Sequence, residues 1–255
     1  MIYLLDFSFR FGQYSRKLKL SIFLLLAFGM ADLQGQVLTG SQLLDKTIAH
    51  HDPNNNWGTF DDQLAITMKT PDKKERISRI RINLPERYFK LSATKDGVTL
   101  EHTLDKDVCT LSLNGSTEIS EEDAETHRLT CERANSMKNY YTYLYGLPMK
   151  LKDPGTIVDP KVQTRTFKGK KYLVLKVNYD DAVGNDSWYF YFDPQTYAME
   201  VYQFFHDETK NDGEYILLSG TETISGILMP KTRAWYYNKD HKYLGTDVLK
   251  PVASE

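Results

Sequence analysis

The stretch that decides the fold is Trp188-Tyr189-Phe190-Tyr191-Phe192-Asp193-Pro194-Gln195-Thr196. Five consecutive aromatic residues favour an extended strand, because rings suit a pleated, half-buried surface. The residues Asp193-Pro194 then end the strand in a turn. Since side chains of a strand alternate between its two faces, rings must stand on both faces here. The stretch therefore predicts a β-sheet that needs apolar cover on both sides, from a second layer of the chain, a ligand, a membrane or a partner.

The segments around this stretch continue the pattern. Residues 198–206 form the return strand and carry Tyr202, Phe204 and Phe205. Before the stretch, the turn Lys168-Gly169-Lys170 joins two extended segments, and after it Ser225-Gly226 joins two more. The strands expected in this half cover residues 162–167, 172–179, 188–192, 198–206, 213–224, 229–237 and 242–249.

The first half of the chain alternates in the same way. Leu64, Ile66 and Met68 are separated by polar or small residues, as in a half-buried strand, and Asn114-Gly115 is a strong turn signal. Five short strands with close turns predict an antiparallel meander over residues 57–70, 80–84, 89–93, 98–104 and 108–113.

Two helices are expected beside the strands. A short amphipathic helix starts at Thr39 or Ser41 and ends near His51, before a segment rich in Pro and Asn. A longer helix starts after Ser120, a good N-cap residue, and ends near Gly146. The predicted fold is mainly β: a curved antiparallel sheet or half-open β-barrel of about eleven strands wrapped around a helical lid. We expect a single domain over residues 36–250 and a frayed tail over residues 251–255.

Residues 1–35 differ from the rest of the sequence. Arg16, Lys17 and Lys19 precede the apolar run from Leu20 to Ala31. This run is shorter than the roughly 20 residues of a membrane-spanning helix. Basic residues, a short apolar run and small residues after it are typical of a secretory signal. The segment is expected to be a cleaved signal peptide or an uncleaved anchor, which indicates an exported protein.

The cysteines and the charge narrow the function classes. Export implies an oxidising compartment, where Cys109 and Cys131 either form a disulfide or stay as two separate buried thiols. The formal charge is −2, from 32 basic and 34 acidic side chains, and no basic face is evident, so no nucleic-acid partner is expected.

No motif indicates catalysis, a metal or a cofactor. The most metal-like segment is His50-His51-Asp52, but neighbouring helical residues point in different directions, so a helix end is the simpler reading. The sequence contains no nucleophile-elbow serine motif and no phosphate-binding glycine loop. The pairs Asp61-Asp62 and Asp180-Asp181 lie in turn-like settings that usually serve solvation.

Several segments together resemble a known superfamily. The element order, the stretch from Trp188 to Thr196, and Gly226-Ile227-Leu228-Met229-Pro230-Lys231 resemble the LolA/LolB-like lipoprotein carrier superfamily. More closely, Tyr143-Leu144-Tyr145-Gly146-Leu147-Pro148 and Ala198-Met199-Glu200-Val201-Tyr202-Gln203-Phe204-Phe205 resemble an uncharacterised family of exported bacterial proteins with that fold. The resemblance implies an unclosed barrel, a helical lid and a cavity for acyl chains. No local motif matches the carriers' lipoprotein-binding arginine.

The first hypothesis is therefore an exported protein of the periplasm or cell envelope of a Gram-negative bacterium that binds a hydrophobic or amphiphilic ligand. Its partner would be a lipid or a lipidated protein, with the envelope membrane surface as a further contact. The residues predicted to line the cavity by apolar burial are Tyr141, Tyr145, Trp188, Phe190, Tyr202, Phe204, Trp235 and Tyr237. The alternatives are a non-catalytic interaction module with a solid aromatic core and, third, a hydrolase that uses Asp or His from the loops.

Overall fold

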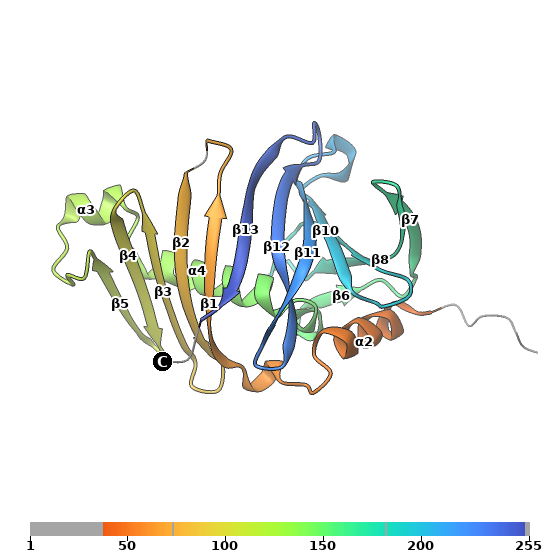
Figure 1. The fold of residues 1–255 in the computed structure, drawn as a ribbon, viewed down its shortest axis with the longest axis horizontal. Coiled ribbons are helices and arrows are strands. Elements are labelled where there is room, and N and C mark those ends of the chain that lie inside the picture. The colour runs from red at the N-terminus through yellow and green to blue at the C-terminus, as the bar shows by residue number, and fades with distance from the viewer. Residues whose placement is uncertain (1–37, 73, 182, 253–255) are drawn as a thin grey trace, which may run out of the picture. The chain divides into compact units, whose positions relative to one another are not determined.

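The computed structural model describes residues 38–252, apart from residues 73 and 182. Within this part of the chain, thirteen strands form one antiparallel sheet (Figure 1). The strands are β1 (Asp61–Lys69), β2 (Glu75–Asn83), β3 (Tyr88–Lys95), β4 (Val98–Asp105), β5 (Val108–Leu113), β6 (Thr156–Val158), β7 (Gln163–Phe167), β8 (Lys170–Tyr179), β9 (Ser187–Phe192), β10 (Met199–Phe205), β11 (Glu214–Ile224), β12 (Ile227–Tyr237) and β13 (Tyr243–Pro251).

The strand order is β5-β4-β3-β2-β1-β13-β12-β11-β10-β9-β8-β6, and β7 pairs with β8 beside β6. The described sheet is therefore curved and open, with β5 at one edge and β6 and β7 at the other (Figure 1). The predicted mainly β class and the antiparallel hairpins are confirmed. Pro251, expected in the frayed tail, is the last residue of β13.

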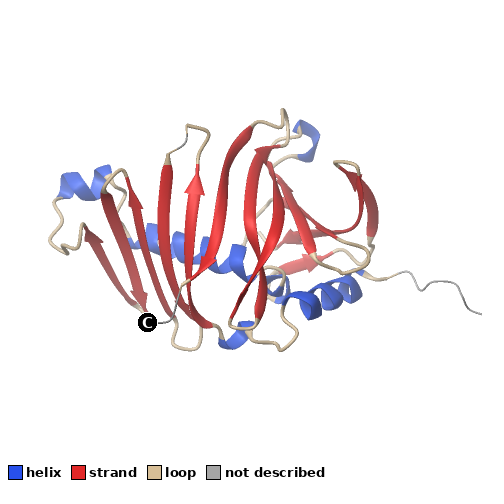
Figure 2. Cartoon of the chain, in the orientation of Figure 1, coloured by secondary structure: helices blue, strands red, loops and turns tan. Residues whose placement is uncertain are grey.

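The described helices are α2 (Gly40–His51), α3 (Glu121–Thr126) and α4 (Cys131–Gly146), with short 3-10 turns η1 (Trp57–Thr59), η2 (Met149–Lys152) and η3 (Glu208–Lys210). Helices α2 and α4 lie on one side of this sheet and share its main core, whereas α3 has no buried residue. Figure 2 shows α4 crossing one face of the sheet. Leu43 and Leu44 of α2 and Tyr141 and Leu144 of α4 belong to the same buried cluster as the strands. We call this helix-covered side the inner face.

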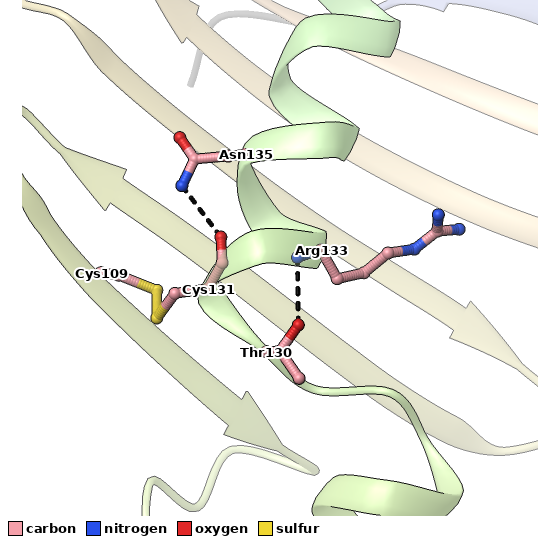
Figure 3. The surroundings of a disulfide bond; sticks show 5 residues. All are labelled: Cys109, Thr130, Cys131, Arg133 and Asn135. Carbon is pink, nitrogen blue, oxygen red and sulfur yellow. Dashed lines mark hydrogen bonds between the residues drawn. A yellow bond between two sulfur atoms is a disulfide. The ribbon is translucent and has the colours of Figure 1, made fainter.

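The single helix predicted after Ser120 is two helices, because the chain breaks between them. Arg128 has a positive φ of 51°, which ends α3, and Thr130 then begins a new helix by accepting a hydrogen bond from the Arg133 N–H (Figure 3). Ser120 caps α3 as predicted. The break allows α4 to start against β5, where Cys131 forms a disulfide with Cys109 (Figure 3).

The aromatic stretch of β9 places its rings on both faces, as strand alternation requires. Phe190 and Phe192 belong to the inner core, whereas Tyr189 and Tyr191 belong to a second cluster on the outer face. Strand β7 covers that second cluster, because Phe167 contacts Tyr191 with ring centroids 5.4 Å apart. The chain itself therefore covers the outer rings.

The expected signal segment, residues 1–35, lies outside the described residues. Among the residues that the structure describes, no helix has the length and apolar character needed to cross a membrane.

Candidate functional site

A cavity of about 680 Å³ lies between α4 and the inner face of the sheet. It reaches from the end of β1 and the start of β2 to the start of β9, so it crosses the strands near one of their ends. The lining residues come from α4, β1, β2, β9 to β13 and the loops between them. They are Met68, Arg76, Arg133, Met137, Tyr140, Tyr141, Tyr143, Leu144, Asp186, Trp188, Phe204, His206, Glu214, Trp235, Leu244, Gly245 and Asp247. We call this cavity the trough.

Helix α4 forms one wall of the trough because of its side-chain spacing. Ala134, Tyr141 and Tyr145 are buried at helical intervals, which seats the helix on the sheet. Met137 and Tyr140 flank that buried line and face the trough. Tyr140 keeps 38% of its surface exposed, yet burial raises the pKa of its hydroxyl, because the ring lies in the trough and its hydroxyl is surrounded by the walls.

The opposite wall is built from rings of consecutive strands. Trp188 of β9 stacks on Phe204 of β10 with centroids 4.8 Å apart. Tyr143 of α4 meets Trp188 edge-on at 5.6 Å, so helix and sheet approach one another at this ring. Trp235 of β12 continues the wall and contacts Tyr202 at 6.2 Å. The strand register brings these rings together, since Trp188 pairs with Phe204.

The eight residues predicted to line a cavity divide into three groups. Four of them line the trough: Tyr141, Trp188, Phe204 and Trp235. Three are fully buried in the adjoining core: Tyr145, Phe190 and Tyr202. Tyr237 is 42% exposed at the end of β12 and does not line the trough. The alternation of side chains along a strand predicts on which face of the sheet a ring lies. It does not predict where along the strand a cavity lies.

Ionisable side chains also line the trough, and they were not predicted from the sequence. Asp247 on β13 is only 6% exposed, and its Oδ1 atom has no hydrogen-bond partner. Burial raises the pKa of Asp247, while the charges of Arg76 and Arg233 oppose that rise. Burial likewise raises the pKa of Glu214. A polar side chain without a partner in such a place costs free energy unless water or a ligand satisfies it.

At the β9 end of the trough, two loop residues form an ion pair. The Nδ1 atom of His206 lies 2.7 Å from the Oδ1 atom of Asp186, and this hydrogen bond raises the pKa of His206. The lining of the trough contains no serine, threonine or cysteine. The pair therefore has no serine, threonine or cysteine nucleophile on the trough walls to activate.

A second cavity of about 520 Å³ lies on the other side of Tyr143. It shares Tyr143, Asp186 and Trp188 with the trough. The hydroxyls of Tyr143 and Tyr179 are hydrogen-bonded to each other, so this pair joins α4 to β8 between the two cavities. Burial raises the pKa of Tyr143 above its ordinary value.

The metal-like segment His50-His51-Asp52 is a structural helix end. His51 donates from Nδ1 to the Leu228 carbonyl at 2.7 Å, and its Nε2 accepts from the Met199 N–H at 2.9 Å. Both ring nitrogens are therefore used to hold α2 on β10 and β12. Among the described residues, no three His, Cys, Asp or Glu side chains gather as a metal site would require.

The trough residues that were not predicted differ in how far the sequence marks them. Tyr140 and Tyr143 lie in the aromatic segment of the helix, so a helical projection placed around Tyr141 could have found them. Arg76 has a weaker signal, since it precedes Ile77 at the start of a strand whose inward positions are otherwise apolar or small. Arg133 and Asp247 had no local signal, because their role depends on how α4 lies across distant strands.

Comparisons with known proteins identify a family and remote structures. Residues 19–250 match a family described as "Family of unknown function (DUF6503)". No curated protein sequence matches the chain.

Three solved structures are similar to the chain at low identity. A LolA superfamily protein from Nitrosomonas europaea has a TM-score of 0.48 and 10% identity, over 86% of this chain and 95% of that one. A putative outer membrane lipoprotein-sorting protein domain from Vibrio parahaemolyticus has a TM-score of 0.46 and 12% identity, over 84% and 92%. A DUF1329 family protein from Desulfovibrio piger has a TM-score of 0.46 and 7% identity, over 82% and 90%. These structures include the superfamily that the sequence resembles, and they say nothing about a ligand of this chain.

Proposed function

Because the chain belongs to the DUF6503 family, whose function is unknown, we propose a function from its own trough: it binds a hydrophobic or amphiphilic molecule between α4 and the sheet. The observation that carries this proposal is the aromatic and aliphatic lining of a cavity of about 680 Å³. Cavities of roughly 300–1,000 Å³ with mostly apolar walls and a few polar groups are typical ligand sites.

The energy available from such walls is sufficient for specific binding. Each buried methylene contributes about 0.8 kcal/mol. Ten methylenes therefore give about 8 kcal/mol, the free energy of micromolar binding before the costs of association. The aromatic walls made by Trp188, Phe204 and Trp235 supply the apolar contact.

Two features support an exported carrier or sensor in the cell envelope. The N-terminal sequence has the basic residues and short apolar run of a secretory signal. The Cys109–Cys131 disulfide fits an oxidising compartment. A lipid or a lipidated protein is then the natural source of the ligand.

The trough favours binding over the two alternatives. An interaction module with a solid core needs no lined space beside α4. A hydrolase is favoured only by the Asp186–His206 pair, in which His206 is well exposed, and the trough walls hold no serine, threonine or cysteine.

Displacement of a fluorescent probe tests the proposal. N-phenylnaphthylamine, a neutral apolar dye, is expected to gain fluorescence with the purified protein and to lose it when dodecanol is added. Trp235→Ala is expected to weaken dye binding about tenfold, because it removes a ring from the wall. Tyr237→Ala, on the same strand and outside the trough, is the matched control. An absence of dye binding, with a crystal structure in which side chains fill the trough, would exclude the proposal.

A further inference from the structure

The two ends of the trough carry opposite charges. Arg76 lies on β2 and Arg133 lies in the first turn of α4, which contacts β3, β4 and β5. Asp186 and Glu214 line the far end, near β9 and β11. Strands β1, β13, β12, β11 and β10 separate β2 from β9, so the basic and acidic ends are well apart. The apolar residues lie between them.

Within the described part of the chain, the two arginines at the basic end form no ion pair, although the charge of Arg76 acts on Asp247. Among the described residues, the arginines that form ion pairs are Arg81 and Arg87. The Nε atom of Arg76 is buried without a hydrogen-bond acceptor. In Figure 3 the side chain of Arg133 extends away from the disulfide and over the strands. A guanidinium is the side chain best suited to bind a carboxylate or phosphate through paired hydrogen bonds. Arg133 is exposed at the rim of the trough, whereas the Nε atom of Arg76 is buried.

Beside Arg76, the floor of the trough has buried polar atoms without hydrogen-bond partners. Asp247 is more than nine-tenths buried, lines the trough and has an Oδ1 atom without a partner. Arg233 stands opposite Asp247 on β12, where its guanidinium donates to the Pro230 and Leu144 carbonyls but leaves its Nε unpartnered. The charges of Arg76, Arg133 and Arg233 exceed that of Asp247, so this end has a net positive charge.

Resting on the proposed function, we propose that the ligand's polar group is an oxyanion, bound between Arg76 and Arg133. Its alkyl chain then follows α4 past Met137 and Tyr140 to Trp188. From Arg133 to Leu144 the helix rises about 16 Å, at 1.5 Å per residue, which is the length available to the chain. A carboxylate and a phosphate monoester share this chemistry.

The acidic end does not suit the same group. Asp186 is already bonded to His206, and Glu214 would repel an anion. A cationic head group beside Trp188 and Phe204 is the competing arrangement, because ammonium groups bind aromatic faces near carboxylates. The two arrangements predict opposite preferences for ligands of equal chain length.

The experiment compares four amphiphiles that differ only in the head group. Dodecanoate, dodecyl phosphate, dodecanol and dodecyltrimethylammonium displace N-phenylnaphthylamine from the full chain below their micelle concentrations. We expect one or both anions to bind about tenfold more tightly than dodecanol, and the cation to bind no better than dodecanol. The ratio between the two anions tells a fatty acid from a phosphate ester.

Variants locate the effect. Arg76→Gln and Arg133→Gln are each expected to remove most of the anion preference, measured as the affinity for each anion relative to that for dodecanol. Arg79→Gln is the matched control, because Arg79 lies on the same strand and points outward to solvent. Equal binding of all four amphiphiles, or tighter binding of the cation, would overturn the oxyanion site and leave the proposed function intact. No displacement by any amphiphile would instead reject the proposed function.

Discussion

The two faces of strand β9 carry the same kind of side chain in different surroundings. On the outer face, Tyr191 is 3% exposed and packs between Phe167 and Tyr172. On the inner face, Trp188 borders the trough and is only partly buried. Aromatic content alone therefore does not indicate a binding cavity.

The difference arises from what covers each face. Strand β7 follows the outer curve because it is joined to β8 by a tight turn at Lys168-Gly169, which brings Phe167 onto the rings. The guanidinium of Arg165 lies 4.1 Å above the Tyr189 ring and completes that cover. A helix is a straight cylinder, so α4 touches the curved inner face along a line and leaves space beside it. An extended strand closes a curved surface that a helix leaves open.

The largest effect is expected on the outer face. Tyr191→Ala should lower the free energy of unfolding by about 3–5 kcal/mol, since it leaves a cavity in a filled cluster and removes the hydrogen bond to Gln203. Urea denaturation measures this change. A loss below about 1 kcal/mol would mean that the outer face is not closed as described.

Acid should lower the free energy of unfolding through the packed part of the inner face, where His51 holds α2 on β10 and β12. Burial lowers the pKa of His51 to about 4 from its ordinary value of 6.5. The unfolded chain therefore takes up this proton first, and stability falls as the pH drops from 6.5 towards 4, by up to about 3 kcal/mol. His51→Gln should flatten this part of the pH profile of unfolding, and His50→Gln should preserve it. Parallel profiles for both variants would contradict the assignment.

A smaller effect is expected for a ring of the trough. Phe204→Ala should cost about 1–2 kcal/mol, because it widens an existing space and removes a side chain that is already partly exposed. Urea denaturation beside Tyr191→Ala gives the comparison directly. If Phe204→Ala is as costly as Tyr191→Ala, the inner wall is packed and the contrast between the faces fails.

The smallest expected effect is a difference in stability between arginine variants on the two faces of the sheet. Arg165→Gln should lower stability by about 0.5–1 kcal/mol, since it removes a guanidinium stacked on Tyr189. Arg76→Gln should lower stability by less than Arg165→Gln does, because that guanidinium forms no ion pair among the described residues and acts on Asp247 only through its charge. Thermal melts of both variants are sufficient. Equal losses would show that Arg76 has a structural partner in the free protein.

The fold followed from the sequence where local patterns decide it. The period of two in Leu64, Ile66 and Met68 predicted the strand and its inner face. The turn at Asn114-Gly115 predicted the end of β5, and Ser225-Gly226 predicted the hairpin of β11 and β12. The helix boundary was wrong, because the left-handed residue Arg128 has no sequence signature as strong as glycine. The short strand β6 has little pattern of its own, and its pairing with β8 depends on tertiary structure.

The trough was predictable only in part. Tyr141, Trp188, Phe204 and Trp235 were found because rings are visible in a sequence. The sequence left open what covers each face, and on the outer face the cover is β7, a part of the chain itself. The positions of Arg76, Arg133 and Asp247 follow from the crossing of α4 over distant strands, which no local pattern encodes.

The Cys109–Cys131 disulfide fixes the start of α4 to the sheet. It attaches the first residue of the helix to the edge strand β5, while the other end of the helix is held by non-covalent contacts. That other end is deeply packed, with Leu144 and Tyr145 buried and Tyr143 bonded to Tyr179. The exposed first turn that carries Arg133 is therefore the part of the helix that most needs a covalent attachment, and the cross-link keeps it against β5 whatever occupies the trough.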